Sequence, residues 1–461
     1  MIHAYTLHGK NIILDVGSGS VHVADPVAYA AIRRWEESPD KNALRASLQV
    51  EFTGAPPEEF DALFGDIETL IRQKKLFALE MAEGSGYAAL AEKRRAAQPE
   101  VVKALCLHVA HTCNLACDYC FAKAGTYSGA AGKMPLETGK RALDFLVERS
   151  GPRKNLEVDF FGGEPLMNWP VVKSLVAYAR ALESTREKRF RFTLTTNGVL
   201  VDDEVIAFCN DEIDNVVLSL DGRREIHDRL RVFPGKSGQS SYDLVVPKFR
   251  RFAEARARAG KSYYMRGTFT HANPDFCADV LHMAALGFRS LSMEPVVCDA
   301  ASPHALTQDD LRIVMEQYER LALEMAKRAG TPEEFTFYHY MLDLKHGPCL
   351  YKRVTGCGSG TEYLAVTPTG ELYPCHQFVG EGRFRMGDVW RGIANPALRA
   401  EFNALSLYSR AECQTCWARL YCSGGCAANA HHACGSIHGV YPAGCELFRK
   451  RMECAVWLAA G

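Results

Sequence analysis

Three cysteines, Cys113, Cys117 and Cys120, stand close together in the run HTCNLACDYCF, with the spacing Cys-x3-Cys-x2-Cys. Thiolates at this spacing can bind three irons of a [4Fe–4S] cluster from a single loop. Because such clusters normally take four cysteines, three ligands leave the fourth iron open to a small molecule. The alternative is a zinc knuckle, in which His108 or His111 would supply the fourth ligand.

Six segments with strand patterns and several amphipathic stretches follow one another through the middle of the chain. The predicted strands cover 104–111, 156–161, 190–196, 215–220, 263–270 and 290–295, and the helical stretches between them include 136–150, 171–183 and 243–259. This alternation predicts βαβ units and a parallel sheet, and therefore an α/β fold. Sites in parallel barrels lie at the carboxyl ends of the strands. The cysteine loop directly follows the first strand, at that rim.

Short polar and glycine-rich motifs end the next three strands: FFGGEP at 160–165, TTNG at 195–198 and SLDG at 219–222. Each motif alone is a common turn sequence, so their order and their position at strand ends carry the information. Together with the cysteine loop, and with the aromatic Tyr119 before its last cysteine, the series resembles the radical S-adenosylmethionine (SAM) enzymes. The resemblance implies a partial (β/α)6 barrel and a cluster whose open iron binds SAM.

The resemblance also implies which side chains meet SAM. Glycines at the end of the second strand let the backbone approach a ligand closely. Arg231, in EIHDRLR, is a candidate for a bidentate contact with the SAM carboxylate. Arg266 and Glu294 stand near strand ends as well, where an ion pair or barrel packing explains them equally well. The residues expected at SAM are Tyr119, Gly162, Gly163, Glu164, Asn197, Ser219 and Arg231.

The tail is dense in cysteine, and ten of the seventeen cysteines lie beyond residue 345. The run Cys-x2-Cys-x5-Cys-x3-Cys at 413–426 is a metal-binding pattern, for which zinc ribbons are the alternative. The whole series resembles the SPASM extension of radical SAM peptide-modifying enzymes, which implies two auxiliary [4Fe–4S] clusters and three clusters in all. The implied ligands are Cys357, Cys375 and Cys426 for the first, with Cys349 or an open iron completing it, and Cys413, Cys416, Cys422 and Cys445 for the second.

The bulk composition restricts the partners and the compartment. A net charge of −1 argues against a broad surface for nucleic acid or membrane, and no apolar run reaches transmembrane length. The first residues lack a signal-peptide core. Seventeen cysteines in such a chain are expected to bind metal rather than to form disulfides, so the predicted location is cytoplasmic.

Four regions are expected along the chain. Residues 1–85 combine short strands with helical patterns at 26–37, 42–51 and 57–73. This unit resembles the winged-helix peptide-recognition domain that binds a leader peptide by adding a strand to its sheet; the alternative is a capping unit without a chemical role. Residues 86–103 are predicted to be a linker, 104–330 the radical SAM barrel, and 331–461 the cysteine-rich SPASM domain.

Three sequence segments narrow the range of expected functions: LDVGSGSVHVAD, CWARLYCSGGCAANA and CELFRKRMECAVW. They resemble the maturases of SCIFF peptides, which are short, cysteine-rich and ribosomally made. The resemblance implies that a 5′-deoxyadenosyl radical removes hydrogen from a threonine Cα, to which a cysteine sulfur then bonds as a thioether. The implied partners are a precursor peptide with its leader and an electron donor such as flavodoxin or ferredoxin.

Three alternatives to this function remain. An anaerobic sulfatase maturase would oxidise a Cys or Ser side chain and would need no leader-binding domain. A peptide maturase that makes a side-chain thioether or a carbon–carbon crosslink would share all the regions of the chain. From a different class, the protein could be a non-catalytic zinc or iron–sulfur scaffold.

Overall fold

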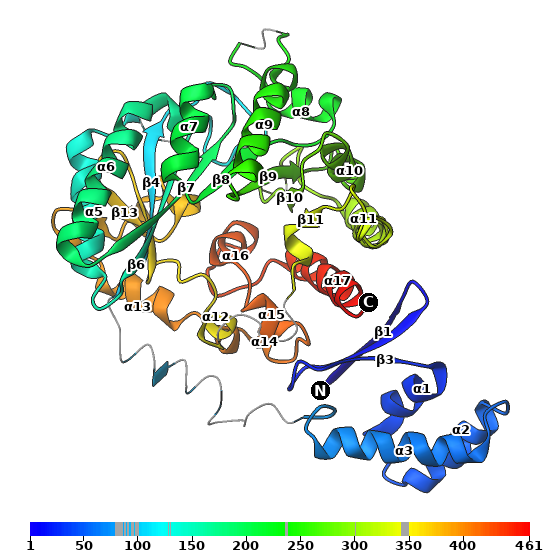
Figure 1. The fold of residues 1–461 in the computed structure, drawn as a ribbon. Coiled ribbons are helices and arrows are strands. Elements are labelled where there is room, and N and C mark those ends of the chain that lie inside the picture. The colour runs from blue at the N-terminus through cyan, green and yellow to red at the C-terminus, as the bar shows by residue number, and fades with distance from the viewer. Residues whose placement is uncertain are drawn as a thin grey trace.

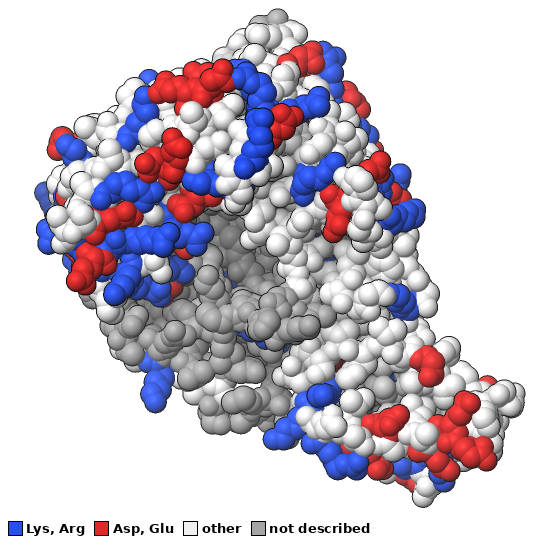
Figure 2. Space-filling view, viewed as in Figure 1, with Lys and Arg blue, Asp and Glu red and all other residues white. Residues whose placement is uncertain are grey.

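The computed structural model describes residues 1–78, 101–127, 131–235, 238–299, 301–342 and 350–461, with a few isolated residues between these ranges and only the backbone of 350–352 (Figure 1). Cys349 and much of the predicted linker 86–103 lie outside the described residues. Within the described part, no helix is long and apolar enough to cross a membrane. On the face seen in Figure 2, basic and acidic side chains intermix over the barrel helices.

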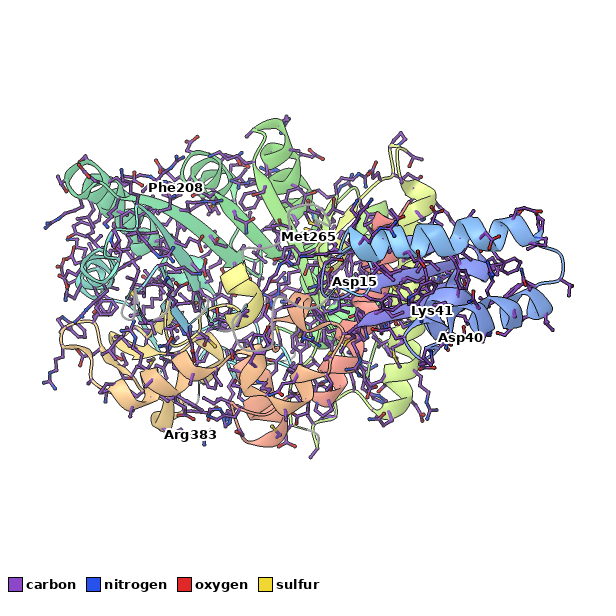
Figure 3. All side chains as sticks on the ribbon, turned by 90° about the horizontal axis from the view of Figure 1, so that it is seen from below. Asp15, Asp40, Lys41, Phe208, Met265 and Arg383 are labelled. Atoms are coloured by element: carbon purple, nitrogen blue, oxygen red, sulfur yellow. The ribbon has the colours of Figure 1, made fainter. Side chains whose placement is uncertain are left out.

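The N-terminal unit is a small antiparallel sheet packed against three helices. Its strands β1 (Ile2–Leu7), β2 (Lys10–Asp15) and β3 (Val21–Ala24) pair in the order β1-β2-β3. The helices are α1 (Pro26–Trp35), α2 (Lys41–Glu51) and α3 (Pro57–Arg72). Asp25 and Asp40 cap the first two helices by accepting backbone N–H groups. Figure 3 places Asp15 at the sheet and Asp40 and Lys41 at the start of α2.

The central unit is an open barrel of six βα repeats. Its parallel strands lie side by side in chain order, from β10 through β9, β8, β7 and β6 to β4. The strands are β4 (Ala104–His111), β6 (Asn155–Gly162), β7 (Arg189–Thr196), β8 (Asn215–Ser219), β9 (Ser262–Phe269) and β10 (Ser290–Pro295), and the two-residue β5 (Gly132–Lys133) pairs with β4. The helices are α5 (Leu136–Arg149), α6 (Trp169–Arg186), α7 (Asp203–Glu212), α8 (Arg224–Leu230), α9 (Ser241–Arg258), α10 (Cys277–Ala285) and α11 (Gln308–Arg328).

Alternation along the strands divides the barrel into an apolar outer layer and a polar interior. Phe190, Phe192 and Leu194 of β7 are buried, and Phe192 lies under Arg180 of α6, so this face meets the helices. Successive strand side chains point to opposite faces. The partly exposed residues between them, such as Thr193 and Thr195, therefore face the barrel interior.

The tail extends the barrel sheet and covers its open side. β12 (Tyr363–Val366) pairs in parallel with β4, and β13 (Glu371–Tyr373), β14 (Gly387–Asp388) and β15 (Gly392–Ile393) continue the sheet; β11 (Thr336–Phe337) pairs with β10 at the other edge. The tail helices are α12 (Leu350–Thr355), α13 (Pro396–Ala404), α14 (Ala411–Gln414), α15 (Arg419–Cys422), α16 (Ala427–Cys434) and α17 (Pro442–Ala459). Single 3-10 turns are η1 (Pro165–Asn168), η2 (Tyr338–Tyr340), η3 (His376–Phe378), η4 (Gly382–Phe384) and η5 (Leu407–Ser409). The long α17 packs between α11 and β1 (Figure 1).

Candidate active site

The cysteine loop begins at the carboxyl end of β4 and is fixed by the chain that follows α8. The backbone N–H of Ala116 donates to the carbonyl of Val232 at 2.8 Å, and that of Asp118 donates to Leu230 at 3.0 Å. Burial raises the pKa of the Cys113 thiol to about 11 and that of Cys117 to about 12. A bound metal is what keeps such desolvated thiols ionised.

A single zinc ion would hold its thiolate ligands close together. Thiolates bound at about 2.3 Å from one zinc would lie within about 4 Å of one another. Among the described residues, the one group of three or more ligand atoms mutually within 4.8 Å is Glu381, His431 and His432, and no set of cysteines meets this limit. His108 and His111 bond to each other, with Nδ1 and Nε2 3.1 Å apart.

Glu164 joins the ends of β6 and β7 beside the loop. It is 1% exposed, and its carboxylate accepts hydrogen bonds from the Thr196 hydroxyl and the Asn197 N–H at 2.8 Å and from the Leu166 N–H at 3.0 Å. Burial raises its pKa to about 7. The Asn197 amide nitrogen in turn donates to Asn114 Oδ1 at 2.8 Å and lies 3.6 Å from Cys113 Sγ. Asn197 thus borders the first cysteine, and Glu164 positions it.

The glycines of FFGGEP serve a close approach between two backbones. The Gly163 N–H donates to Ala110 at 2.8 Å, and a Cβ on Gly163 would lie 2.2 Å from the carbonyl oxygen of Thr112. The same Cβ would lie 2.9 Å from Cα of Gly125. Gly162 has φ +131°, which side chains rarely adopt. These glycines let the end of β6 contact both ends of the cysteine loop.

A second polar cluster joins the loop to the ends of β8 and α8. Arg231 donates through Nε and Nη2 to the two oxygens of Asp221, at 2.8 and 2.9 Å, and the Tyr119 hydroxyl donates to Asp221 at 2.8 Å. Burial opposes ionisation of Asp221, but Arg231 outweighs it and the pKa stays below its usual range. The edge of Arg231 expected to hold a SAM carboxylate is therefore occupied by Asp221. Sequence reasoning missed Asp221, although it stands inside the SLDG motif beside Ser219, which ends β8.

The barrel interior carries further polar groups, among them Glu294, which the sequence already placed near a strand end. Glu294 of β10 lies 3.4 Å from both His339 Nε2 and Arg451 Nη1. Burial opposes its ionisation, but His339 and Arg451 lower its pKa overall. The ring of His376, from the tail, lies 5.1 Å from that of Phe161 on β6 and is tilted by 47° against it. The tail thus contributes side chains to the interior, which only the folded chain reveals.

The tail cysteines form two sets. Burial, together with the nearby Cys426 and Cys357 thiols, raises the pKa of Cys375 to about 12. The second set of four lines one cavity that also contacts Ala418, Gly424 and Pro442. Its members are Cys413, Cys416, Cys422 and Cys445.

Comparison with known proteins decides the chemistry of the barrel. Residues 107–246, which contain the loop and all three strand-end motifs, match the model of the radical SAM superfamily. This segment of the chain therefore matches the radical SAM superfamily. The match implies SAM and a [4Fe–4S] cluster, for which Cys113, Cys117 and Cys120 are the candidate ligands.

Proteins of several activities are similar in sequence to this chain. MJ0907, an uncharacterised protein of Methanocaldococcus jannaschii, is 30% identical over 140 residues, which is 30% of this chain and 45% of that protein. The radical SAM cyclopropyl synthase TigE of Paramaledivibacter caminithermalis is 22% identical, over 78% of this chain and 75% of the synthase. A serine-type anaerobic sulfatase-maturating enzyme of Klebsiella aerogenes is 22% identical, over 70% of this chain and 78% of that enzyme.

Two solved structures are similar to most of this chain. AnSMEcpe with bound AdoMet and the Kp18Cys peptide superposes with TM-score 0.62 and 20% identity, covering 78% of this chain and 99% of its own. SuiB of Streptococcus suis, bound to S-adenosylmethionine, superposes with TM-score 0.53 and 15% identity, covering 95% of this chain and 97% of its own; it is also solved with its precursor peptide SuiA. The predicted α/β fold, a radical SAM barrel with an open parallel sheet, is confirmed.

Proposed function

We propose that this radical SAM enzyme is a peptide maturase that forms an intramolecular thioether, from a cysteine sulfur to a threonine Cα, in a ribosomally made precursor peptide. The observation that carries the proposal is the docking of the N-terminal unit on the cysteine-rich tail. The Tyr5 hydroxyl donates to the Glu453 carbonyl at 2.8 Å, and His3 Nε2 lies 3.0 Å from the Glu453 carboxylate. The His3 ring stacks 3.7 Å from Trp417, the residue after Cys416.

The exposed edge of this docked sheet suits a leader peptide. β1 faces α17 and pairs with β2, so β3 is the opposite edge of the three-stranded sheet. Val23 of β3 is 54% exposed. An extended peptide that adds a strand to such an edge gains backbone hydrogen bonds, and side-chain contacts give it specificity. A leader held there would tether its core peptide near the tail and the barrel.

The tail cysteines suit the oxidative part of the reaction. SAM bound at a [4Fe–4S] cluster supplies a carbon radical that can remove a hydrogen atom from the peptide. Forming the thioether removes two hydrogens from the peptide in total, so an electron must also leave it. Cys357, Cys375 and Cys426, with Cys349 or an open iron, and the second set of four would hold two auxiliary clusters that receive it. Three clusters, a flavodoxin or ferredoxin as donor, and a cytoplasmic location complete the proposal.

A sulfatase-maturase-like oxidation of a Cys or Ser side chain is the second candidate. The likeness to anSMEcpe, a chain that this protein matches over 99% of its length, favours it. That match leaves 22% of the present chain uncovered, whereas SuiB leaves 5%. The larger coverage includes much of the N-terminal unit, which favours the precursor-peptide maturase. Maturases that make a side-chain thioether or a carbon–carbon crosslink fit the same fold.

The test is anaerobic reconstitution with iron and sulfide, followed by incubation with SAM, dithionite and a cysteine-rich peptide carrying its leader. We expect 5′-deoxyadenosine and a peptide lighter by two hydrogens for each crosslink. Replacing Cys113, Cys117 or Cys120 by Ala should abolish 5′-deoxyadenosine, while Cys298→Ala, in the chain after β10, serves as the control. A protein that binds only zinc and leaves SAM intact would refute the proposal.

A further inference from the structure

Arg410 is a buried cation in the centre of the tail. The residue is 3% exposed and immediately precedes α14. Its Nε donates to the carbonyl of Gly439 and its Nη2 to that of Ile437, both at 2.9 Å. These bonds hold the guanidinium against the loop that leads to Cys445, and its own carbonyl accepts from the N–H of Cys413 at 3.1 Å.

The third guanidinium nitrogen faces the loop that joins the two cysteine sets. Gly424 lies between Cys422 of the second set and Cys426 of the first. A Cβ on Gly424 would come within 2.8 Å of Arg410 Nη1, so the glycine leaves room for the cation. Arg410 also lines the cavity that contains Cys357. It therefore borders ligand candidates of both proposed clusters.

The guanidinium of Arg410 is held by neutral groups. Within the described part of the chain, no carboxylate pairs with Arg410, whose bonds go to neutral carbonyl groups. A buried charge without a counter-ion is costly. Thiolate-ligated clusters, which are negatively charged, would supply the missing opposite charge on both sides.

We infer that Arg410 sets the reduction potentials of the two auxiliary clusters together, by stabilising the extra negative charge that each gains on reduction. Net charge and nearby hydrogen bonds are known determinants of cluster potential. A fixed cation in a poorly solvated site interacts strongly with such charges. Arg410 would therefore raise both potentials and help the clusters to accept the electron that leaves the peptide. This role presupposes the auxiliary clusters of the proposed function.

The test is a redox titration followed by electron paramagnetic resonance, in full-length protein whose Cys113, Cys117 and Cys120 are all replaced by Ala, so that the auxiliary clusters alone give signals. Arg410→Met should shift both midpoint potentials to lower values. Arg410→Lys keeps the charge but loses the forked donors, so its potentials should stay near those of the parent. Arg383→Met, which removes a tail cation bonded to His431, is the control and should change neither (Figure 3 shows Arg383 at the tail).

The outcomes separate this role from a structural one and from the proposed function. Unchanged potentials in Arg410→Met, or a shift of one cluster alone, would overturn the inference. If the Arg410→Met protein does not assemble its clusters, the Arg410→Lys variant is measured instead. Midpoint potentials equal to those of the parent protein then support an electrostatic role, and lower potentials refute it. If the parent protein with the three Ala substitutions itself binds no iron, the proposed auxiliary clusters are absent, and both the proposed function and the inference fail.

Discussion

Asp221 and Arg231 form a two-point ion pair beside the cysteine loop, with Nε–Oδ2 at 2.8 Å and Nη2–Oδ1 at 2.9 Å. Asp221 ends the loop after β8, and Arg231 stands between Leu230 and Val232, whose carbonyls hold the cysteine loop. The pair therefore links the segment after β8 to the residues that hold the cysteine loop in place. Tyr119, bonded to the same carboxylate, fixes the loop from inside.

Asp221→Asn should destabilise the fold and loosen the cysteine loop. It leaves the guanidinium of Arg231 buried without its counter-ion, which costs about 3–5 kcal/mol in comparable buried pairs. Denaturant unfolding gives the loss of stability, and iron content after reconstitution gives the effect on the loop. Asp243→Asn, which breaks the exposed pair with Arg224, is the control and should behave like the parent. Parental stability and iron content in Asp221→Asn would contradict this role.

Gly163→Ala should prevent cluster assembly with little effect elsewhere. The added methyl would sit 2.2 Å from the carbonyl oxygen of Thr112, so the backbone before Cys113 would have to move. Gly65→Ala in α3 is the matched control, since no atom lies within 4 Å of its Cβ. Removing a helical glycine there should stabilise the protein by about 0.5–1 kcal/mol. Normal iron binding by Gly163→Ala would show that the close approach is not needed.

Because of Glu164, we expect the free energy of unfolding to depend on pH. Its pKa in the folded chain is about 7, above its ordinary value of 4.5, because it is buried. Between these values the folded state keeps a proton that the unfolded chain has lost, so stability falls as the pH rises through this window, by about 3 kcal/mol in all. Urea unfolding at about pH 5 and about pH 8 measures the fall.

Glu164→Gln isolates this effect. The substitution removes the titrating group and should abolish most of the difference between the two pH values. Because the new amide nitrogen cannot accept the Asn197 N–H, we expect a loss of about 1–3 kcal/mol at the lower pH. A variant with the same pH dependence as the parent would assign the fall in stability to other groups.

The strands and their order could be predicted from the sequence. Apolar and polar residues alternate within a strand, and this alternation indicates which face of the strand is buried. The predicted strand 104–111 coincides with β4, and 290–295 coincides with β10. The local sequence of a segment does not show which distant segment it pairs with or contacts. Pairing of Tyr363–Val366 with β4 and the arrival of His376 beside Phe161 depend on residues far apart in the chain.

The motif residues illustrate the same limit at the site. The types of these residues indicated a ligand site, and their predicted position at the ends of strands was correct. In the structure, however, they bond directly to other groups of the protein. Glu164 binds Thr196 and Asn197, and Arg231 binds Asp221. Such buried pairs could not be found from spacing, because a carboxylate and a guanidinium satisfy each other as well as they satisfy a ligand.

Val23→Asp on β3 should weaken peptide binding without changing SAM cleavage in the absence of peptide. The side chain is exposed at the sheet edge, so a carboxylate there disturbs an added strand and not the core of the unit. Affinity for a leader peptide, measured by fluorescence anisotropy, should fall about tenfold or more, which corresponds to 1.4 kcal/mol or more. Val50→Asp on α2, also exposed, is the control. Unchanged affinity in Val23→Asp would exclude the β3 edge as the docking site.

The central claim is the thioether, and mass spectrometry of a cysteine-rich precursor peptide co-expressed with this enzyme tests it most directly. After thiol alkylation and fragmentation, we predict a peptide that has lost two hydrogens per crosslink, with the crosslinked cysteines unalkylated and joined to threonine Cα. A peptide whose cysteines are all alkylated, or one oxidised at a single Cys or Ser side chain without a crosslink, would contradict the claim.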